Sequence, residues 1–154
     1  MKLRNIVTIL VLLFAGAMMS FAANPNLGTW KLNEAKSKLA PGTPKNTTVV
    51  YAAAGDMIKG TIDGVDGDGK PAHNEWTGKF DGKDYPVTGD PSSDSRAFKP
   101  IDDHTWELTV KKGGKVTISG RIVLAADGKS RTVTIKGTNA AGKSVESVAV
   151  YEKQ

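Results

Sequence analysis

The sequence predicts an all-β protein, an antiparallel up-and-down barrel of about eight to ten strands with a short helical turn near its start. Apolar and polar residues alternate in short runs along most of the chain, which is the period of a strand with one packed and one wet face. Turn pairs such as Gly113-Gly114 and Asp127-Gly128 separate the runs, and they supply the backbone angles that tight hairpins need. Short hairpins favour an up-and-down order, and closure into a barrel removes exposed sheet edges.

The first 22 residues are expected to be a secretory signal peptide that precedes the barrel. A positively charged start leads into the apolar run Ile6–Met19, which is shorter than the roughly 20 residues of a membrane-spanning helix. Ser20-Phe21-Ala22 follows, with small residues at the two positions that a signal peptidase reads. We therefore expect cleavage after Ala22, a periplasmic or secreted location, and a single domain over residues 23–154.

The composition limits the class of the mature domain. The chain has no cysteine, which excludes disulfides, thiolate metal sites and lipid attachment at a cysteine. Two of the 21 Lys and Arg residues lie in the signal, so the mature domain carries 19 cations against 16 acids. These charges alternate along the chain, as on a solvated surface, and do not cluster as in nucleic-acid binders. We expect no nucleic-acid partner, no membrane anchor, no cofactor and a monomer.

The strands can be placed in order along the chain. Gly28–Leu32 opens the domain, and Asn33–Leu39 is the only segment after the signal with the composition of a helical turn, before Pro41-Gly42 ends it. The further strands are expected at Thr47–Ala53, Met57–Asp63, Ala72–Phe80, Tyr85–Thr88, Ser95–Ile101, Thr105–Lys111, Val116–Ala125, Arg131–Thr138 and Val145–Glu152. The alternation gives three sets of residues that each share one face of a strand and are expected to be packed. They are His104, Trp106, Leu108 and Val110; Val116, Ile118, Gly120, Ile122 and Leu124; and Val133, Ile135 and Gly137. Gly120 and Gly137, in the middle of their strands, mark a sharp bend of the barrel or a close approach, or else simple bulges.

The tripeptide Gly28-Thr29-Trp30, on the first expected strand, resembles the G-x-W motif of the lipocalins and the wider calycin group of ligand-binding barrels. The resemblance implies that Gly28 and Trp30 are structural, with the Trp30 ring closing one end of the barrel and a cavity entered from the other end. That group pairs the tryptophan with a basic residue near the last strand. Lys153 is the cation available there, where an arginine would match the group more closely.

Large aromatic side chains on the expected strands are the candidate ligand-binding residues. Aromatic walls with a few polar groups are typical of a small-molecule pocket. The set comprises Tyr51, Trp76, Phe98, Trp106 and Tyr151. The partner is then a small apolar molecule held inside the barrel, while a filled barrel with a structural or interaction role is an alternative.

Two histidines provide a second alternative, a small β-barrel enzyme. His73 and Glu75 lie two residues apart on one expected strand and therefore share a face. A histidine beside a carboxylate can act as a general base or bind a metal, with His104 as the third group. No nucleophile motif and no phosphate-binding loop occurs in the sequence, so we favour the ligand-binding hypothesis.

A cluster of acids marks one turn. Asp63, Asp66 and Asp68 lie within a Gly-rich segment, and three carboxylates with nearby carbonyls could hold calcium. The same residue types favour a long hairpin turn. Lys70, inside the same segment, would repel a cation. We therefore expect a turn and no metal site.

Overall fold

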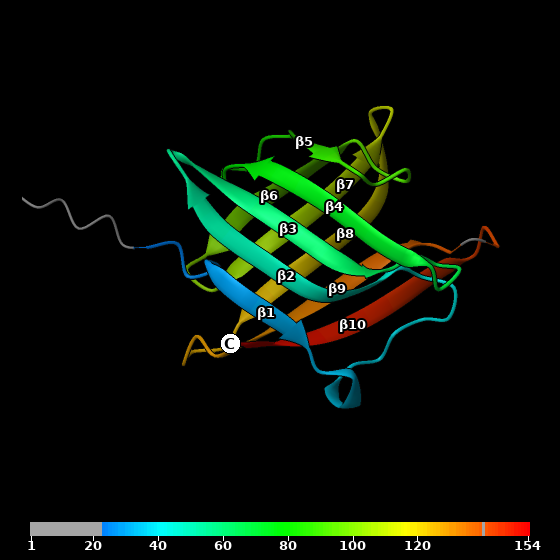
Figure 1. Cartoon of the computed structure of the whole chain (residues 1–154), viewed down its shortest axis with the longest axis horizontal. Helices are drawn as coiled ribbons and strands as arrows, with labels where there is room; N and C mark the ends of the chain where they lie inside the picture. Colours follow the sequence, from blue (N-terminus) through cyan, green and yellow to red (C-terminus); the bar gives the residue numbers. More distant parts are fainter. Residues whose placement is uncertain (1–22, 140) are drawn as a thin grey trace, which may run out of the picture.

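A computed structural model of the chain describes residues 23–139 and 141–154 and forms a closed barrel of ten antiparallel strands. Each strand pairs with its neighbour in the sequence, and the last strand pairs with the first (Figure 1). The strands are β1 (Gly28–Leu32), β2 (Lys45–Ala54), β3 (Met57–Val65), β4 (Pro71–Gly78), β5 (Tyr85–Thr88), β6 (Ser95–Asp102), β7 (Thr105–Lys112), β8 (Lys115–Leu124), β9 (Ser130–Thr138) and β10 (Ser144–Lys153). The predicted fold class is confirmed, and the expected signal peptide lies outside the described residues.

The helical segment is shorter than the sequence suggests. It is a single 3-10 turn, η1, over Glu34–Lys36, capped by the side chain of Asn33, which accepts a hydrogen bond from Lys36 N. Among the described residues no helix is long and apolar enough to cross a membrane. The ten strands therefore provide nearly all of the regular structure of the described residues.

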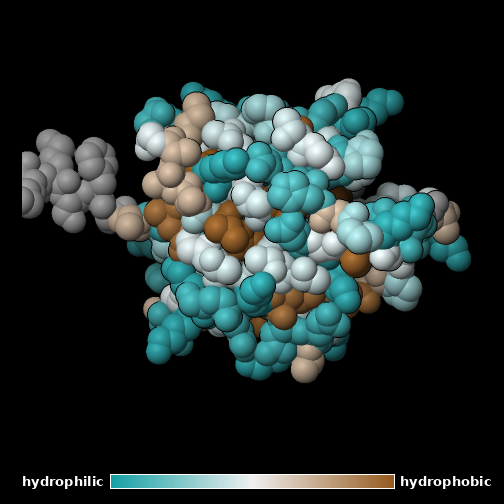
Figure 2. Space-filling view, viewed as in Figure 1, coloured by the Kyte–Doolittle hydropathy of each residue, from teal (hydrophilic) through white to brown (hydrophobic). Residues whose placement is uncertain are grey.

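The up-and-down order gives the barrel two distinct ends. We call one end the floor, which carries the N-terminal residues 24–27 and the turns at 55–56, 79–84, 103–104 and 125–129. We call the other end the mouth, which carries the turns at 66–70, 89–94 and 113–114 and the β9–β10 turn. On the side formed by β2 to β4, hydrophilic and neutral residues cover most of the outer surface, with smaller hydrophobic areas between them (Figure 2).

The β1–β2 connection, residues 33–44, runs along β10 beyond the end of β1. Asn33 N donates to Val150 O at 2.8 Å, and Lys38 forms a two-way backbone bridge with Val148. Ala40 N then donates to the Ser147 hydroxyl oxygen at 2.9 Å. Because β1 has only five residues, this connection completes the wall between β10 and β2 near the mouth.

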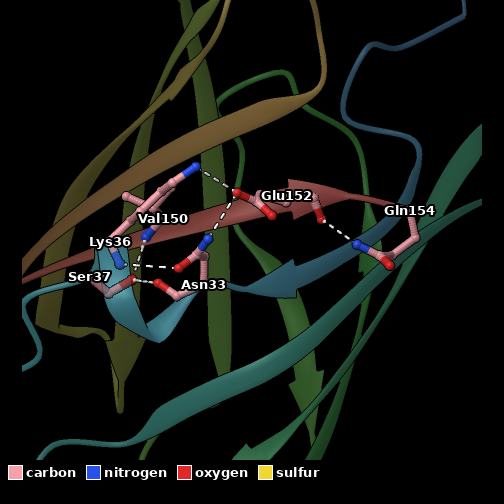
Figure 3. Close-up of polar contacts among 6 residues, drawn as sticks. All are labelled: Asn33, Lys36, Ser37, Val150, Glu152 and Gln154. Carbon is pink, nitrogen blue, oxygen red and sulfur yellow. Dashed lines mark hydrogen bonds and ion pairs between the residues drawn. The ribbon is translucent and has the colours of Figure 1, made fainter.

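Side-chain hydrogen bonds link residues 33–37, at the start of this connection, to β10. One carboxylate oxygen of Glu152 accepts from Asn33 Nδ2 and from Lys36 Nζ, both at 2.9 Å (Figure 3). The Ser37 hydroxyl donates to Asn33 O and accepts from Val150 N (Figure 3). The hydrogen bond from Lys36 is the main cause that lowers the pKa of Glu152.

An aromatic cluster fills the floor half of the barrel. Its members are Tyr51, Trp76, Phe80, Phe98 and Trp106, in edge-to-face pairs apart from the stacked Phe80 and Phe98 rings. The ring centres of Trp76 and Phe98 are 4.9 Å apart, and those of Phe80 and Phe98 are 4.7 Å apart. Rings of this size reach across the barrel and exclude a cavity at this level.

One residue of β8 faces the opposite way from the prediction. Ile122 and Leu124 are buried as expected, but Val116 is 57% exposed. A register shift in β8 makes Val110 pair with Ile118 and Lys111 pair with Val116. The extra residue reverses the alternation, so the prediction for Val116 was wrong.

Candidate ligand cavity

The mouth half of the barrel contains a cavity of about 290 Å³. Its lining reaches from Tyr51, Arg131 and Tyr151 on the floor side to Gly67 and Pro91 in the turns of the mouth. This volume is at the lower limit of small-molecule pockets, which measure roughly 300–1,000 Å³. The barrel is thus packed at the floor and hollow toward the mouth.

Side-chain size explains why only one half is hollow. The inward positions that line the cavity carry mostly aliphatic side chains, among them Val49, Ile62, Leu108, Val110, Ile122 and Val133. Valine and isoleucine are short and stiff, and they do not reach across a barrel as the aromatic rings near the floor do. The strand pattern therefore leaves an apolar space above the aromatic cluster.

The structure brings three of the five candidate ligand-binding residues to the cavity. Tyr51, Phe98 and Tyr151 line it, whereas Trp76 and Trp106 are outside its lining and belong to the aromatic cluster. Both tryptophans point inward and are at most 5% exposed. They lie near the floor because β4 ends just after Trp76 and β7 begins just before Trp106.

Trp30 is fully buried at the floor, where the G-x-W resemblance places it. Its Nε1 donates to Asn26 O at 2.8 Å, and the Lys153 ammonium lies 5.1 Å from the ring centre. Gly28 has a φ of 121°, and a Cβ there would lie 2.7 Å from Lys153 Cε. The glycine therefore provides both the backbone angle and the space for the lysine beside the tryptophan.

Arg131 is a buried, cavity-lining residue that was not among the residues predicted from the sequence. Its guanidinium carbon lies 4.6 Å from the centre of the Trp30 ring and 5.3 Å from the centres of the Tyr51 and Tyr151 rings. The signal was present in the sequence, because Arg131 continues the inward-facing series of Val133 and Ile135 at a spacing of two. An arginine in that series is a buried cation.

The guanidinium of Arg131 is incompletely paired. The residue is 3% exposed and lines the cavity, and neither its Nε nor its Nη1 has a hydrogen-bond partner within the described part of the chain. Burial lowers the pKa of Arg131, while Tyr51 and Tyr151 act in the opposite direction. An arginine nevertheless stays charged in proteins, so a positive charge lies at the floor side of the cavity.

Arg96 is a second arginine in the lining of the cavity. Its Nη2 is 3.4 Å from the side-chain oxygen of Asn74, which is itself 9% exposed. Burial lowers the pKa of Arg96, and Asp90 raises it. The oxygens of Asp90 accept hydrogen bonds from Ser92 and Ser93 in the β5–β6 turn, so this carboxylate is already engaged at the mouth.

The three residues of the enzyme alternative are not brought together. His73 Nδ1 is 2.6 Å from Asp63 Oδ1, and its Nε2 is 3.9 Å from Glu75 Oε1, with exposed side chains. His104 lies in the β6–β7 turn at the floor, and His73 lies near the mouth end of β4. The hydrogen bond to Asp63 is the main cause that raises the pKa of His73.

The acidic segment forms a hairpin turn. One oxygen of Asp66 accepts from the backbone amides of Asp68 and Lys70, both at 2.9 Å. Asp63 is paired with His73 on the neighbouring strand. Within residues 23–139 and 141–154, no group of three His, Cys, Asp or Glu side chains has an arrangement that could hold a metal ion.

Two comparisons of the sequence with known proteins find no relative. No protein-family model matches the chain, and a search of curated proteins finds no significant match. The ten-stranded antiparallel barrel is consistent with a calycin-like fold, and the fold and the cavity carry the functional argument.

Proposed function

We propose that this protein binds one small, predominantly apolar molecule inside its barrel. The observation that supports the proposal is the 290 Å³ cavity with aliphatic and aromatic walls, open toward a ring of turns and closed by the aromatic cluster. Buried apolar surface contributes roughly 25 cal/mol per Å², so walls of this kind favour an apolar ligand. Two buried arginines, Arg96 and Arg131, interrupt these apolar walls, and polar groups at particular positions are typical of pockets that orient their ligand.

The protein acts as a carrier or sensor outside the cytoplasm. The signal-like N-terminus in the sequence supports export to the periplasm or secretion, with residues 23–154 as the mature, monomeric domain. A chain without cysteine needs no disulfide to fold there. The ligand would enter through the mouth, because the floor is closed by Trp30 and the aromatic cluster.

The two alternatives have less support. An enzyme built on His73, Glu75 and His104 needs these groups in one place, and the first and last lie at opposite ends of the barrel. A purely structural, filled barrel needs side chains that occupy the whole interior, as they do only in the floor half.

Native mass spectrometry of the mature protein tests the proposal. Protein purified from its own cells, or mixed with a neutral naphthylamine fluorophore, should carry one small molecule per chain, and denaturing conditions should release it. Substitution of an outer-surface residue, Val123→Ser, serves as a control and should retain the adduct, since Val123 is 43% exposed. A protein that never carries a small molecule, natural or added, would contradict the proposal.

A further inference from the structure

We propose that the ligand is an amphipathic carboxylate whose head group pairs with Arg131 and whose apolar chain lies between the aliphatic walls. The inference rests on the proposed ligand-binding function and specifies the ligand's chemical class. It also gives the ligand an orientation. Arg131 is the second residue of β9, which begins at the floor, so the carboxylate points toward the floor and the chain toward the mouth.

The free donors of Arg131 are the first argument. A buried charge without a partner is costly, by several kcal/mol per ion even after relaxation. The rings of Trp30, Tyr51 and Tyr151 offset part of this cost through cation–π attraction. They leave Nε and Nη1 without acceptors within the described part of the chain. A carboxylate supplies two acceptor oxygens in the geometry that a guanidinium prefers.

The charge balance around the cavity is the second argument. Among the described residues, no ion pair joins Arg131 to a carboxylate. Asp66 and Asp90 also line the cavity, but they lie in the turns of the mouth, whereas Arg131 lies near the floor end of β9. Lys45, also in the lining, is paired with Glu34 at 3.1 Å. The charge that remains deep in the cavity is therefore positive and complements an anion.

The walls are the third argument. Above Arg131 the lining is aliphatic, with Ile122, Val133, Ile135 and Ala149 on three neighbouring strands. A chain of methylene groups gains about 0.8 kcal/mol for each group that leaves water. The small volume limits the chain to a medium length. A neutral hydrocarbon would leave the guanidinium unpaired, and a fully polar anion would leave the walls uncovered.

Competition between matched ligands tests the inference on the whole mature protein. A neutral naphthylamine fluorophore is bound first and then displaced with decanoate or with decanol, which have chains of the same length. We expect decanoate to bind about tenfold more tightly, as a charge-assisted hydrogen bond provides. If decanol displaces the fluorophore as well as decanoate does, the carboxylate inference fails and the ligand-binding function stands. If no ligand binds at all, the proposed function fails with it.

Two variants test whether the preference for decanoate over decanol depends on Arg131. Arg131→Gln should weaken decanoate binding about tenfold and change decanol binding less than about threefold, which also shows that the variant is folded. Arg121→Gln is the matched control, because Arg121 is exposed on β8. This variant should bind decanoate and decanol as tightly as the unsubstituted protein. Equal losses of both ligands in the Arg131 variant would assign Arg131 a merely structural role and overturn the inference.

A measurement on the unsubstituted protein covers the case in which Arg131→Gln does not fold. The carboxyl carbon of labelled decanoate is followed by NMR as the pH falls. Beside a guanidinium, the bound acid should have a lower pKa than the free acid in water. A raised pKa would place the carboxyl in an apolar environment without a cation, which contradicts pairing with Arg131.

Discussion

The guanidinium of Arg131 lies over the ring of Trp30, with its carbon 4.6 Å from the ring centre. The pair joins the residue that closes the floor to the residue at the base of the cavity. Trp30 belongs to β1, and its Nε1 donates a hydrogen bond to Asn26 O in the N-terminal segment. Arg131 belongs to β9, which is separated from β1 by β10. The contact therefore lies between the closed floor of the barrel and the base of its cavity.

Trp30→Ala tests the closure of the floor. The ring is fully buried, so its removal should lower the free energy of unfolding by about 3–5 kcal/mol. Val123→Ala, on the outer surface, should change it by less than about 0.5 kcal/mol. Chemical denaturation of both variants checks this, and a loss below about 1 kcal/mol for Trp30→Ala would show that the ring is not part of the core.

Gly120 and Gly137 form a matched pair on neighbouring strands. A Cβ on Gly120 would lie 2.5 Å from the backbone oxygen of Thr134, whereas on Gly137 the nearest atom is a side-chain carbon of Ile118 at 3.2 Å. A backbone oxygen cannot rotate away from the new Cβ as a side chain can. Gly120→Ala should therefore lower the free energy of unfolding by about 1–3 kcal/mol, and Gly137→Ala by less than about 1 kcal/mol. Denaturation curves that rank the two variants in the reverse order would exclude a close approach at Gly120.

His73 should titrate above its ordinary range. The hydrogen bond to Asp63 raises the pKa of His73, so NMR should place this pKa above the usual histidine value of about 6.5. Because the folded-state pKa is the higher one, the pair stabilises the fold fully below the unfolded pKa and loses this effect as the pH rises through the folded pKa. Asp63→Asn should return the pKa of His73 toward 6.5, and an unchanged value would contradict the pairing.

Processing at the N-terminus is expected after Ala22. The exported protein should begin at Ala23, which N-terminal sequencing or intact mass measurement of the periplasmic or secreted fraction can establish. A protein that keeps its first residues and is found with the membrane fraction would overturn the signal-peptide prediction.

The alternation of residues was sufficient to predict the barrel and its strand order. Each strand was found within two residues of its predicted ends, since turn residues such as Gly113-Gly114 mark the hairpins directly. Val116 was misplaced because a bulge adds one residue without a composition signal. The pattern shows which residues share a face of a strand but contains no information on a one-residue insertion.

The candidate site was predictable only in part. The large aromatic residues on the strands were recognised in the sequence, but the alternation did not decide which face of the sheet is the interior. The position of each residue along the barrel axis also depends on the register between strands. This position along the barrel axis decides whether a residue lines the cavity or belongs only to the aromatic cluster near the floor. The rings over Arg131 come from β1, β2 and β10, and contacts over such sequence distances cannot be derived from local patterns.

A cavity-filling substitution tests the central claim, that the barrel binds a small molecule in its hollow half. Ala149 on β10 lines the cavity between Ser147 and Tyr151, so Ala149→Phe should occupy the space without displacing the floor cluster. In a titration with the neutral naphthylamine fluorophore, the unsubstituted protein should bind one equivalent in a saturable way. Ala149→Phe should bind at least about tenfold more weakly, while Val123→Phe on the outer surface should bind normally. If Ala149→Phe binds as tightly as the unsubstituted protein, or if the fluorophore binds only after heat or acid treatment, the ligand does not occupy this cavity and the account is contradicted.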